Sequence, residues 1–287
     1  MQPTLTLKPN NFVYNFDEHF PKLTDPNKKV GVFLSGGMES SLISLIAAER
    51  YGKDQVIYFY SDSIFSSNDP ARSSYIHTNI ARAAKLLNIT PTYLEFDYQA
   101  HITNRKESID RKIAQIEKEY NVEFVLWGFT SLFFEVEPFK QDGMTMEKVK
   151  EIAFADPERF KSAIEEFHLE TDKYTWHLLD IDIPAEVYPQ LRDTAGFIKS
   201  PFKNLNKCEV VDLYRQLGWL DIVYQTSSCI RESLTKVGKH CGKCFNCQQR
   251  YDAFRILGDV PDLTEYAEHE IVTNRDLLEQ VRNAIHP

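Results

Sequence analysis

The sequence predicts an α/β fold with a mostly parallel, doubly wound sheet, followed by a C-terminal helical segment that holds a cysteine site. Three observations lead to this expectation. Short apolar runs alternate with helical patterns between residues 29 and 128, which is typical of parallel strands covered by helices on both faces. A Ser-Gly-Gly loop follows the first apolar run, and four of the five cysteines fall within residues 229–247.

The strands and helices of the sheet follow from the spacing of apolar residues. The runs KVGVFL, QVIYFYS, PTYLEF and EFVLWG predict four buried strands. Helices are expected between them at 40–51, 70–87 and 102–120, and the second opens with Asp69 as N-cap and Pro70 at the first helical position. Because ligands of such sheets bind beyond the carboxyl ends of the strands, the loop after the first strand is a candidate site.

The chain divides into three predicted parts. Residues 1–28 are polar and contain four prolines, so we expect an N-terminal extension wrapped on the surface, with short strands. Residues 29–225 form the main α/β domain, in which 139–193 is an insertion or lid without regular strand–helix alternation. Residues 226–287 form a metal-binding and helical C-terminal segment.

Two helices are expected near the cysteines. In the run NKCEVVDLYRQLG, Asn206 and Glu209 have the form of a capping box, and Gly218 stops the helix. The run FNCQQRYDAFRILG predicts the second helix.

Composition and charge exclude several classes of function. The chain has 33 basic and 42 acidic residues, a net charge of -9, which disfavours non-specific binding along a nucleic-acid backbone. Its apolar runs are shorter than the roughly 18 residues of a membrane span, and we see no signal peptide at its start. Because the cysteines cluster rather than form a disulfide framework, we expect a cytoplasmic protein; a homodimer is compatible with the sequence.

The loop LSGGMESS has the chemistry of an oxyanion cradle. Two glycines allow a tight turn with no side chain in the way, and successive N–H groups together with the N-terminus of the next helix attract an anion. Ser35, Ser40 and Ser41 add hydroxyl donors. Glu39 makes sense beside phosphates only if a cation lies between them, so we expect Mg²⁺. The alternative is an ordinary strand-to-helix turn.

The C-terminal cysteines have metal-ligand spacing. Two overlapping C-x₂-C steps follow an upstream cysteine by twelve residues, and the four are Cys229, Cys241, Cys244 and Cys247. Four thiolates suit a tetrahedral, structural Zn²⁺ site with no open position. Gly242 permits the tight turn that this spacing needs.

Other interpretations of the cysteine region stay open. An iron–sulfur cluster is the chief alternative to zinc, since C-x₂-C-x₂-C also occurs in ferredoxins. His240 could replace one ligand, although we expect a surface histidine there. Cys208 lies off the apolar stripe of its helix and receives no role.

The loop resembles the SGGxDS loop of the PP-loop ATP pyrophosphatases, with Glu39 in place of the aspartate. Members of that family have a fold like that of the adenine nucleotide α-hydrolases, cleave ATP between the α and β phosphates, and transfer AMP to a carboxylate or carbonyl oxygen. Pro201, Phe202 and Lys207 keep the spacing of a second family motif, in which the lysine reaches the phosphates. On spacing alone, Lys207 would be a solvated lysine at a helix end.

This resemblance implies the roles of the candidate site residues. Glu39, as a ligand of Mg²⁺, and Lys207 are the catalytic candidates, and the end of the second strand holds adenine. The residues implied in binding ATP and pyrophosphate are Ser35, Gly36, Gly37, Met38, Glu39, Ser40, Ser41, Tyr60, Ser61 and Asp62.

The run CGKCFNCQQR resembles the C-terminal motif of the 7-cyano-7-deazaguanine synthases, the QueC group, in which an upstream cysteine completes a zinc site. Members use ATP to join ammonia to the carboxylate of 7-carboxy-7-deazaguanine, and use ATP again to dehydrate the amide to a nitrile. The resemblance implies an ATP-dependent C–N ligase of queuosine biosynthesis that uses ATP, Mg²⁺ and Zn²⁺. Its substrate would be a carboxylate-bearing small molecule, a 7-deazaguanine derivative.

The acceptor side departs from the QueC pattern. Gly128 is kept after the fourth strand, but the family's Asn and its Asp-Cys-Arg run are absent from the matching stretch, WGFTSLFFEVEPF. Its aromatic residues could stack on a deazaguanine or could belong to the core. Two further functions stay open: a nucleotide-binding partner or sensor protein that has lost catalysis, and a PP-loop tRNA-modifying enzyme.

Overall fold

The structure, a computed structural model, describes residues 2–8, 11–61, 70–95, 105–128, 130, 197–202, 205–229, 239–242 and 245–267. Several predictions fall outside these residues. They concern the insertion at 139–193, the N-cap Asp69, the aromatic residues Phe129, Phe133 and Phe134, and the site residues Asp62 and Cys244.

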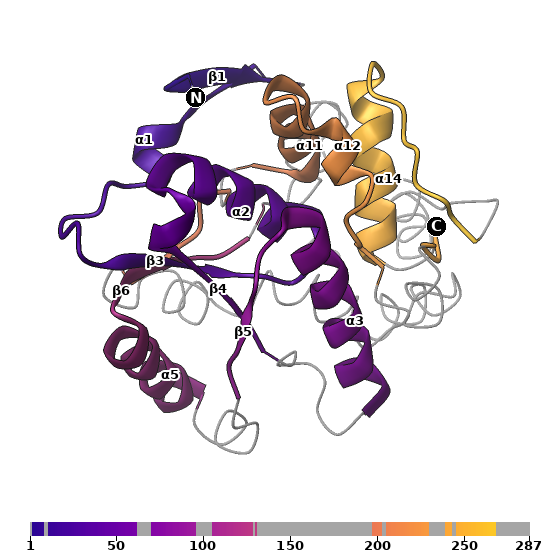
Figure 1. Ribbon diagram of the computed structural model, residues 1–287. Coiled ribbons are helices and arrows are strands. Elements are labelled where there is room, and N and C mark those ends of the chain that lie inside the picture. The colour runs from indigo at the N-terminus through magenta and orange to yellow at the C-terminus, as the bar shows by residue number, and fades with distance from the viewer. Residues whose placement is uncertain are drawn as a thin grey trace, which may run out of the picture.

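Five strands form the central sheet in the order β5-β4-β3-β6-β7 (Figure 1). They are β3 (Lys29–Phe33), β4 (Val56–Tyr60), β5 (Thr92–Tyr93), β6 (Val122–Leu126) and β7 (Ile198–Lys199). Every described pairing between them is parallel. Four of the strands lie in the predicted runs, although β5 is shorter than PTYLEF suggested. The predicted mostly parallel sheet is therefore confirmed.

Helices cover both faces of this sheet. On one face lie α2 (Met38–Tyr51), which a short 3-10 turn at Lys53–Gln55 joins to β4, and α3 (Pro70–Leu87); α5 (Arg105–Tyr120) lies on the other (Figure 1). The apolar side chains of the strands alternate between two cores. Val30 and Val32 are fully buried with residues of α2, whereas Val125 of β6 packs in a second core with Ile116 of α5. This is the doubly wound arrangement that the sequence predicts.

The direction of the connections reverses at β3. The chain passes from β3 through α2 to β4 on one side, and β6 pairs with the other side of β3. The crevice between diverging connections at the carboxyl ends of such strands is where doubly wound sheets bind ligands. The Ser-Gly-Gly loop begins at this point, directly after β3.

The N-terminal segment contributes to the core, which corrects the expectation of a surface extension. An antiparallel hairpin of β1 (Thr4–Leu7) and β2 (Phe12–Asn15) leads into α1 (Phe16–His19). The predicted short strands are thus present, but four side chains of the segment are fully buried in the same core as α2: Leu7, Tyr14, Phe16 and Phe20. The Tyr14 hydroxyl also donates to the Pro201 carbonyl at 3.0 Å.

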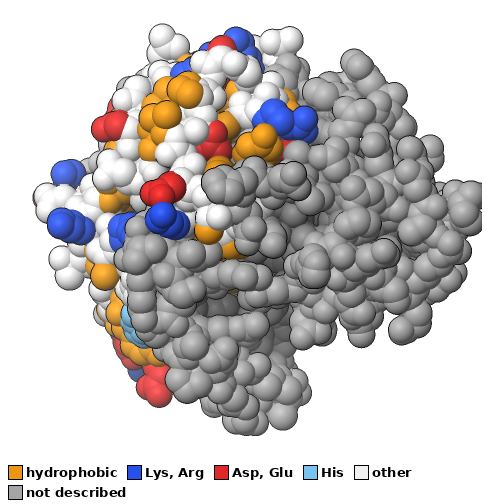
Figure 2. All heavy atoms as spheres, turned by 90° about the vertical axis from the view of Figure 1, so that its right-hand side faces the viewer, with side chains coloured by type: hydrophobic (Ala, Val, Ile, Leu, Met, Phe, Trp, Pro, Cys, Tyr) orange, Lys and Arg blue, Asp and Glu red, His pale blue; other side chains and the backbone are white. Residues whose placement is uncertain are grey.

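The C-terminal helices α11 (Lys207–Gln216), α12 (Leu220–Val223) and α14 (Phe245–Leu257) complete the described fold. The predicted capping box is confirmed, because the Asn206 side chain accepts from the first turn and Glu209 accepts from the Asn206 backbone N–H. α11 packs against α2 and α14. Where Figure 2 colours the described residues, basic and acidic side chains are interspersed. Among the described residues, no helix is long and apolar enough to cross a membrane.

Candidate functional site

The Ser-Gly-Gly loop ends in a helix N-terminus that no side chain caps. α2 begins at Met38 with Gly37 as its N-cap, two residues before the predicted start, so Glu39 lies in the first helical turn. The first N–H groups of a helix have no partner within the helix. Because no side-chain hydrogen bond caps this end, those groups and the helix dipole favour an anion at this position.

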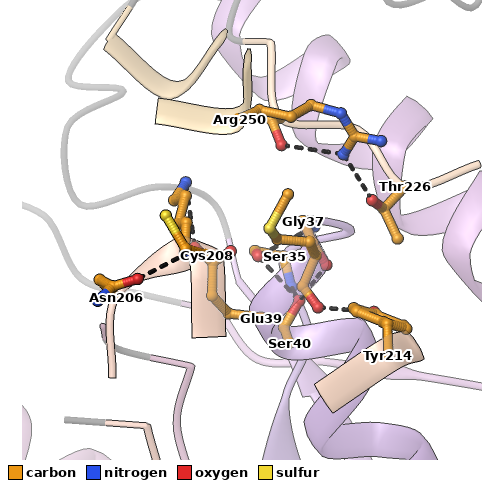
Figure 3. Close-up of polar contacts among 12 residues, drawn as sticks. Ser35, Gly37, Glu39, Ser40, Asn206, Cys208, Tyr214, Thr226 and Arg250 are labelled. Carbon is orange, nitrogen blue, oxygen red and sulfur yellow. Dashed lines mark hydrogen bonds and ion pairs between the residues drawn. The ribbon is translucent and has the colours of Figure 1, made fainter. Parts of the chain in front are cut away.

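Serine hydroxyls fix the shape of the loop (Figure 3). The Ser40 hydroxyl accepts from the Ser35 backbone N–H at 3.1 Å and lies 3.0 Å from the Ser35 hydroxyl, which accepts from the Gly37 N–H at 3.3 Å. Ser41 is fully buried, and its hydroxyl has no partner among the described residues. The side chain of Met38 is buried in the core, so only its backbone can take part in binding.

The two candidate catalytic residues form an ion pair. Lys207, the first residue of α11, lies with its ammonium 3.0 Å from the Glu39 carboxylate, and the two side chains are only 7% and 14% exposed. The reading of Lys207 as a solvated helix-terminal lysine is therefore wrong. Residues 168 positions apart in the chain meet because α11 packs against α2. Removing one member would leave a largely buried charge uncompensated.

Packing holds the start of α2 in place from two sides. The buried Tyr214 hydroxyl of α11 donates to the Met38 carbonyl at 2.7 Å (Figure 3). Burial, reinforced by the Glu39 charge, raises the Tyr214 pKa well above its ordinary value, so this hydroxyl stays a donor. On the β6 side, a Cβ added to Gly128 would lie 3.0 Å from the Glu39 Cβ and 3.0 Å from the Ser40 nitrogen. The close approach explains why the sequence has a glycine there.

A segment between α12 and the cysteine region contacts the loop through its backbone. We call residues 226–229, which follow α12, the strap. The Ser227 N–H donates to the Gly36 carbonyl at 3.0 Å, and the next N–H, of Ser228, donates to His240 Nε2 at 3.0 Å. Since the last strap residue is Cys229, the strap joins the Ser-Gly-Gly loop directly to the cysteine region.

Three of the predicted metal ligands come together. The Sγ atoms of Cys229, Cys241 and Cys247 all lie within 4.8 Å of one another, and all three residues are buried. The Cys241 and Cys247 sulfurs are 3.9 Å apart, and the Cys241 N–H donates to the Cys229 sulfur at 3.3 Å. Gly242 has a φ of 77°, which is the tight turn expected of it. Buried thiols facing one another suit a thiophilic metal ion.

Two predictions near the cysteines are wrong. His240 is not a surface histidine but is 3% exposed. Burial, with the charge of Arg250 adding to it, lowers its pKa to about 3, so the ring is neutral and Nε2 accepts from Ser228. Cys208 does not lie outside the apolar stripe but is fully buried in the main core. Burial raises the pKa of its thiol, so this cysteine is unreactive.

Arg250 links α14, the helix that carries Cys247, to the strap, and the sequence alone did not predict this role. Its guanidinium is fully buried and donates to the Thr264 hydroxyl at 2.7 Å, the Thr226 hydroxyl at 3.0 Å and the Val223 carbonyl at 2.7 Å (Figure 3). Arg250 lies on α14 three residues after Cys247, so the helix that carries one of the clustered cysteines also fixes the start of the strap. The motif CGKCFNCQQR contains the arginine, but only the tertiary structure supplies its partners.

The proposed adenine residues lie at the carboxyl end of β4. The Tyr60 ring lies 5.3 Å from the ring of Tyr93 on β5 and 5.6 Å from that of His77 on α3. Ser61 follows, partly buried. These rings flank the side of the loop opposite to β6, because β4 and β6 pair with opposite edges of β3.

Three comparisons relate the chain to known proteins. The family model described as QueC, queuosine biosynthesis protein QueC, matches residues 186–258. A 7-cyano-7-deazaguanine synthase of Methanobrevibacter smithii is 24% identical over 257 residues, covering 84% of this chain and 99% of that protein. The solved structure of the U34-tRNA thiolase NcsA from Methanococcus maripaludis with its 4Fe-4S cluster aligns over 93% of this chain and 85% of that chain, at 12% identity and a TM-score of 0.40. The expected resemblance to QueC is therefore confirmed by the first two.

Proposed function

We propose that the protein is an ATP-dependent enzyme that forms AMP and pyrophosphate while it activates a carboxylate on a small molecule, a 7-deazaguanine derivative. Amide and nitrile formation, as in QueC, is the outcome that the relatives favour. The observation that carries the proposal is the buried Glu39–Lys207 pair at the uncapped N-terminus of α2. An ordinary strand-to-helix turn has no reason to bury two opposite charges beside a helix N-terminus without a side-chain cap.

In this proposal the loop binds the pyrophosphate end of ATP. The N–H groups at the start of α2 and the Ser35, Ser40 and Ser41 hydroxyls surround the leaving group, and the helix dipole stabilises its charge. Lys207 supplies a positive charge from the opposite element. Tyr60, Ser61 and Asp62 would then hold the adenine at the end of β4.

Glu39 suits a cation site at this loop. Its carboxylate is largely buried and carries one compensating charge, Lys207, in the free protein. Phosphates bound beside Glu39 would add negative charge that Lys207 alone does not compensate, so a further cation should bind with them. Carboxylate and phosphate oxygens are ligands that fit Mg²⁺. A bound Mg²⁺ would supply charge neutralisation at the phosphates. Glu39 is one methylene longer than aspartate, so it can reach such an ion from the first helical turn.

The chemistry explains why ATP is needed. A carboxylate is a poor electrophile, so one of its oxygens first attacks the α-phosphorus of ATP, and the bond from that phosphorus to the bridging oxygen of the β-phosphate breaks. Ammonia then attacks the acyl carbon, loses a proton, and AMP leaves with the former carboxylate oxygen. In nitrile formation the amide oxygen attacks a second ATP in the same way, and the nitrogen loses its protons as AMP leaves. Donors aimed at the departing pyrophosphate stabilise the charge that develops.

The cysteine region fits a single metal ion, and we propose zinc with Cys244 as the fourth ligand. Thiolates about 2.3 Å from a tetrahedral ion lie about 3.8 Å from one another, and the Cys241 and Cys247 sulfurs are 3.9 Å apart. In a cubane iron–sulfur cluster each cysteine binds a different iron, which separates the sulfurs further than the 4.8 Å seen here. With four thiolate ligands and no open position, the ion would have a structural role.

Product analysis tests the proposed function. Protein, Mg-ATP, ammonium and 7-carboxy-7-deazaguanine should give AMP and pyrophosphate, and omission of the acceptor should abolish both. ADP and phosphate would overturn the pyrophosphatase assignment. Tight ATP binding without any cleavage, for every carboxylate offered, would instead favour a nucleotide-binding partner or sensor.

A further inference from the structure

Gly36 lies between two residues that no motif singled out. Its φ is 78°, and a Cβ added there would lie 2.8 Å from the Asn79 carbonyl oxygen and 3.0 Å from the Asn79 Cβ. Asn79 belongs to α3. The Gly36 carbonyl accepts from the strap residue Ser227 at 3.0 Å. Two elements far apart in the sequence therefore approach the same glycine of the nucleotide loop.

Both of these residues bury polar atoms. Asn79 is 2% and Ser227 is 4% exposed. Among the described residues, neither the Asn79 Nδ2 and Oδ1 nor the Ser227 Oγ makes a hydrogen bond. The neighbouring buried side chains of Thr226 and Arg250 are satisfied, whereas the Ser41 hydroxyl of the loop is also unpaired among the described residues. Since native proteins rarely leave such atoms unpaired, a ligand or water is expected where they gather.

The chemistry of an amide indicates which part of a nucleotide Asn79 can serve. A phosphate oxygen only accepts, so it would satisfy Nδ2 and leave Oδ1 beside negative charge. A nucleoside offers donors and acceptors together, in the ribose hydroxyls and in the adenine amino group beside a ring nitrogen, and an amide can pair with the latter in bidentate fashion. The unmet donor and acceptor of Asn79 therefore match the nucleoside rather than the pyrophosphate.

We propose that Asn79, assisted by Ser227, binds the nucleoside portion of ATP and is a specificity-determining residue of this site. The inference rests on the proposed function, which puts ATP at the loop. It assigns a division of labour around Gly36. The α2 N-terminus, Glu39 and Lys207 bind the phosphates, whereas Asn79 of α3 and Ser227 of the strap bind the nucleoside.

The ligand-free protein provides a first test, because the Asn79 side chain makes no hydrogen bond within the part of the chain that the structure describes. Leucine has nearly the same size, and replacing an unsatisfied buried amide by an apolar group of the same shape is neutral or stabilising. Asn79→Leu should therefore leave the unfolding temperature of the ligand-free protein unchanged or raise it. A clear decrease would mean that Asn79 is a structural residue and would overturn the inference.

Calorimetric titration of the full-length protein with Mg²⁺ then decides the role. The ligands are α,β-methylene-ATP, which resists cleavage, AMP and pyrophosphate. For Asn79→Leu we expect the Kd of the ATP analogue and of AMP to rise about 10–100-fold and the Kd of pyrophosphate to stay within about twofold. Ser227→Ala should have the same pattern with a smaller rise. Ser44→Ala is the matched control, because this buried hydroxyl is paired within α2 to the Ser40 carbonyl.

Failure of this inference differs from failure of the proposed function. If the wild-type protein binds the ATP analogue and Asn79→Leu binds it equally tightly, only the inference falls. It also falls if the variant loses pyrophosphate as strongly as AMP, since that result means a distorted loop. If the wild-type protein binds none of the three ligands, the proposed function falls and the inference falls with it.

Discussion

The Ser-Gly-Gly loop and the cysteine region lie at the two ends of the strap, and they bury different kinds of chemical group. At the loop, the α2 N-terminus is uncapped, the buried charges of Glu39 and Lys207 compensate each other, and Asn79 has unmet polar atoms. At the cysteine region, thiols face thiols and the Arg250 guanidinium is surrounded by acceptors. Because His240 Nδ1 at the cysteine region is also unpaired among the described residues, the contrast lies in the kind of group: an uncapped helix end with buried charges suits an anionic ligand, whereas buried thiols suit a metal ion.

The strap makes the two regions depend on each other. Ser227 bonds the loop and Cys229 belongs to the cysteine cluster, with one residue between them. A change at the cysteines should therefore affect both stability and nucleotide binding, whereas a change at the loop should leave the metal content of the cysteine region unchanged. The predictions below test this asymmetry.

Removal of a metal thiolate should have the largest effect. Cys247→Ser should lose the metal and lower the free energy of unfolding by about 4 kcal/mol or more, because a structural metal ion stabilises the fold that presents its ligands. Elemental analysis and denaturant unfolding measure the two quantities. Cys208→Ala is the matched control, since this buried cysteine lies outside the cluster. The control variant should keep about one metal ion per chain. Iron in place of zinc would overturn the zinc assignment.

Loss of the Glu39 carboxylate should affect catalysis next most strongly. Glu39→Ala should lower the rate of AMP formation about 100–1000-fold, equivalent to about 3–4 kcal/mol, by removing the cation site and leaving Lys207 unpaired. Glu39→Asp should preserve or raise the rate, because it keeps the carboxylate. Initial rates at saturating Mg-ATP measure both. An unchanged rate in Glu39→Ala would show that the magnesium role is wrong, and loss of metal from the cysteines would break the asymmetry between the regions.

Arg250→Met should destabilise the protein by about 2–3 kcal/mol, since it removes the guanidinium donor from the Thr226 and Thr264 hydroxyls and one of the donors to the Val223 carbonyl, which keeps those of Thr226. Because Arg250 holds the start of the strap, the Kd of ATP should also rise. Arg250→Lys should recover only part of both losses, as an ammonium cannot reproduce the fork of a guanidinium. Equilibrium unfolding and titration calorimetry give the two numbers. Destabilisation with unchanged ATP affinity would show that the strap does not couple the regions.

Gly128→Ala should have the smallest effect. The added methyl group would press on Glu39 and the Ser40 nitrogen at 3.0 Å and shift the start of α2. We expect the Kd of ATP to rise about fivefold to tenfold, or about 1 kcal/mol, with little change in metal content. Titration against the wild-type protein measures this. An equal or tighter affinity would mean that the β6 side does not help to shape the loop.

Local patterns were enough to predict much of the fold and part of the site. Period and length of the apolar runs predicted β3, β4, β6 and the helices between them, because buried parallel strands read as continuous apolar segments. Asn206 and Glu209 revealed a helix start by their spacing alone. The cysteines that now lie together were also evident, since metal-ligand spacing is a local property.

Features that depend on distant segments could not be predicted. The N-terminal hairpin looked polar, and only its packing against α11 shows why Leu7 and Tyr14 are buried. α2 starts at Met38 because Gly37 serves as N-cap, a position where serine or threonine is the usual signal. Asn79 and Ser227 belong to no recognised motif. Their proximity to the loop could not be predicted, because it depends on two distant elements that meet at Gly36.

The central claim is that the loop directs transfer of AMP to a carboxylate oxygen, and an isotope label tests it most directly. 7-Carboxy-7-deazaguanine labelled with ¹⁸O in its carboxylate is incubated with the protein, Mg-ATP and ammonium, and the nucleotides are analysed by mass spectrometry. Each AMP should carry one ¹⁸O, because the carboxylate oxygen leaves with it. Unlabelled AMP, or label in inorganic phosphate together with ADP, would contradict the account.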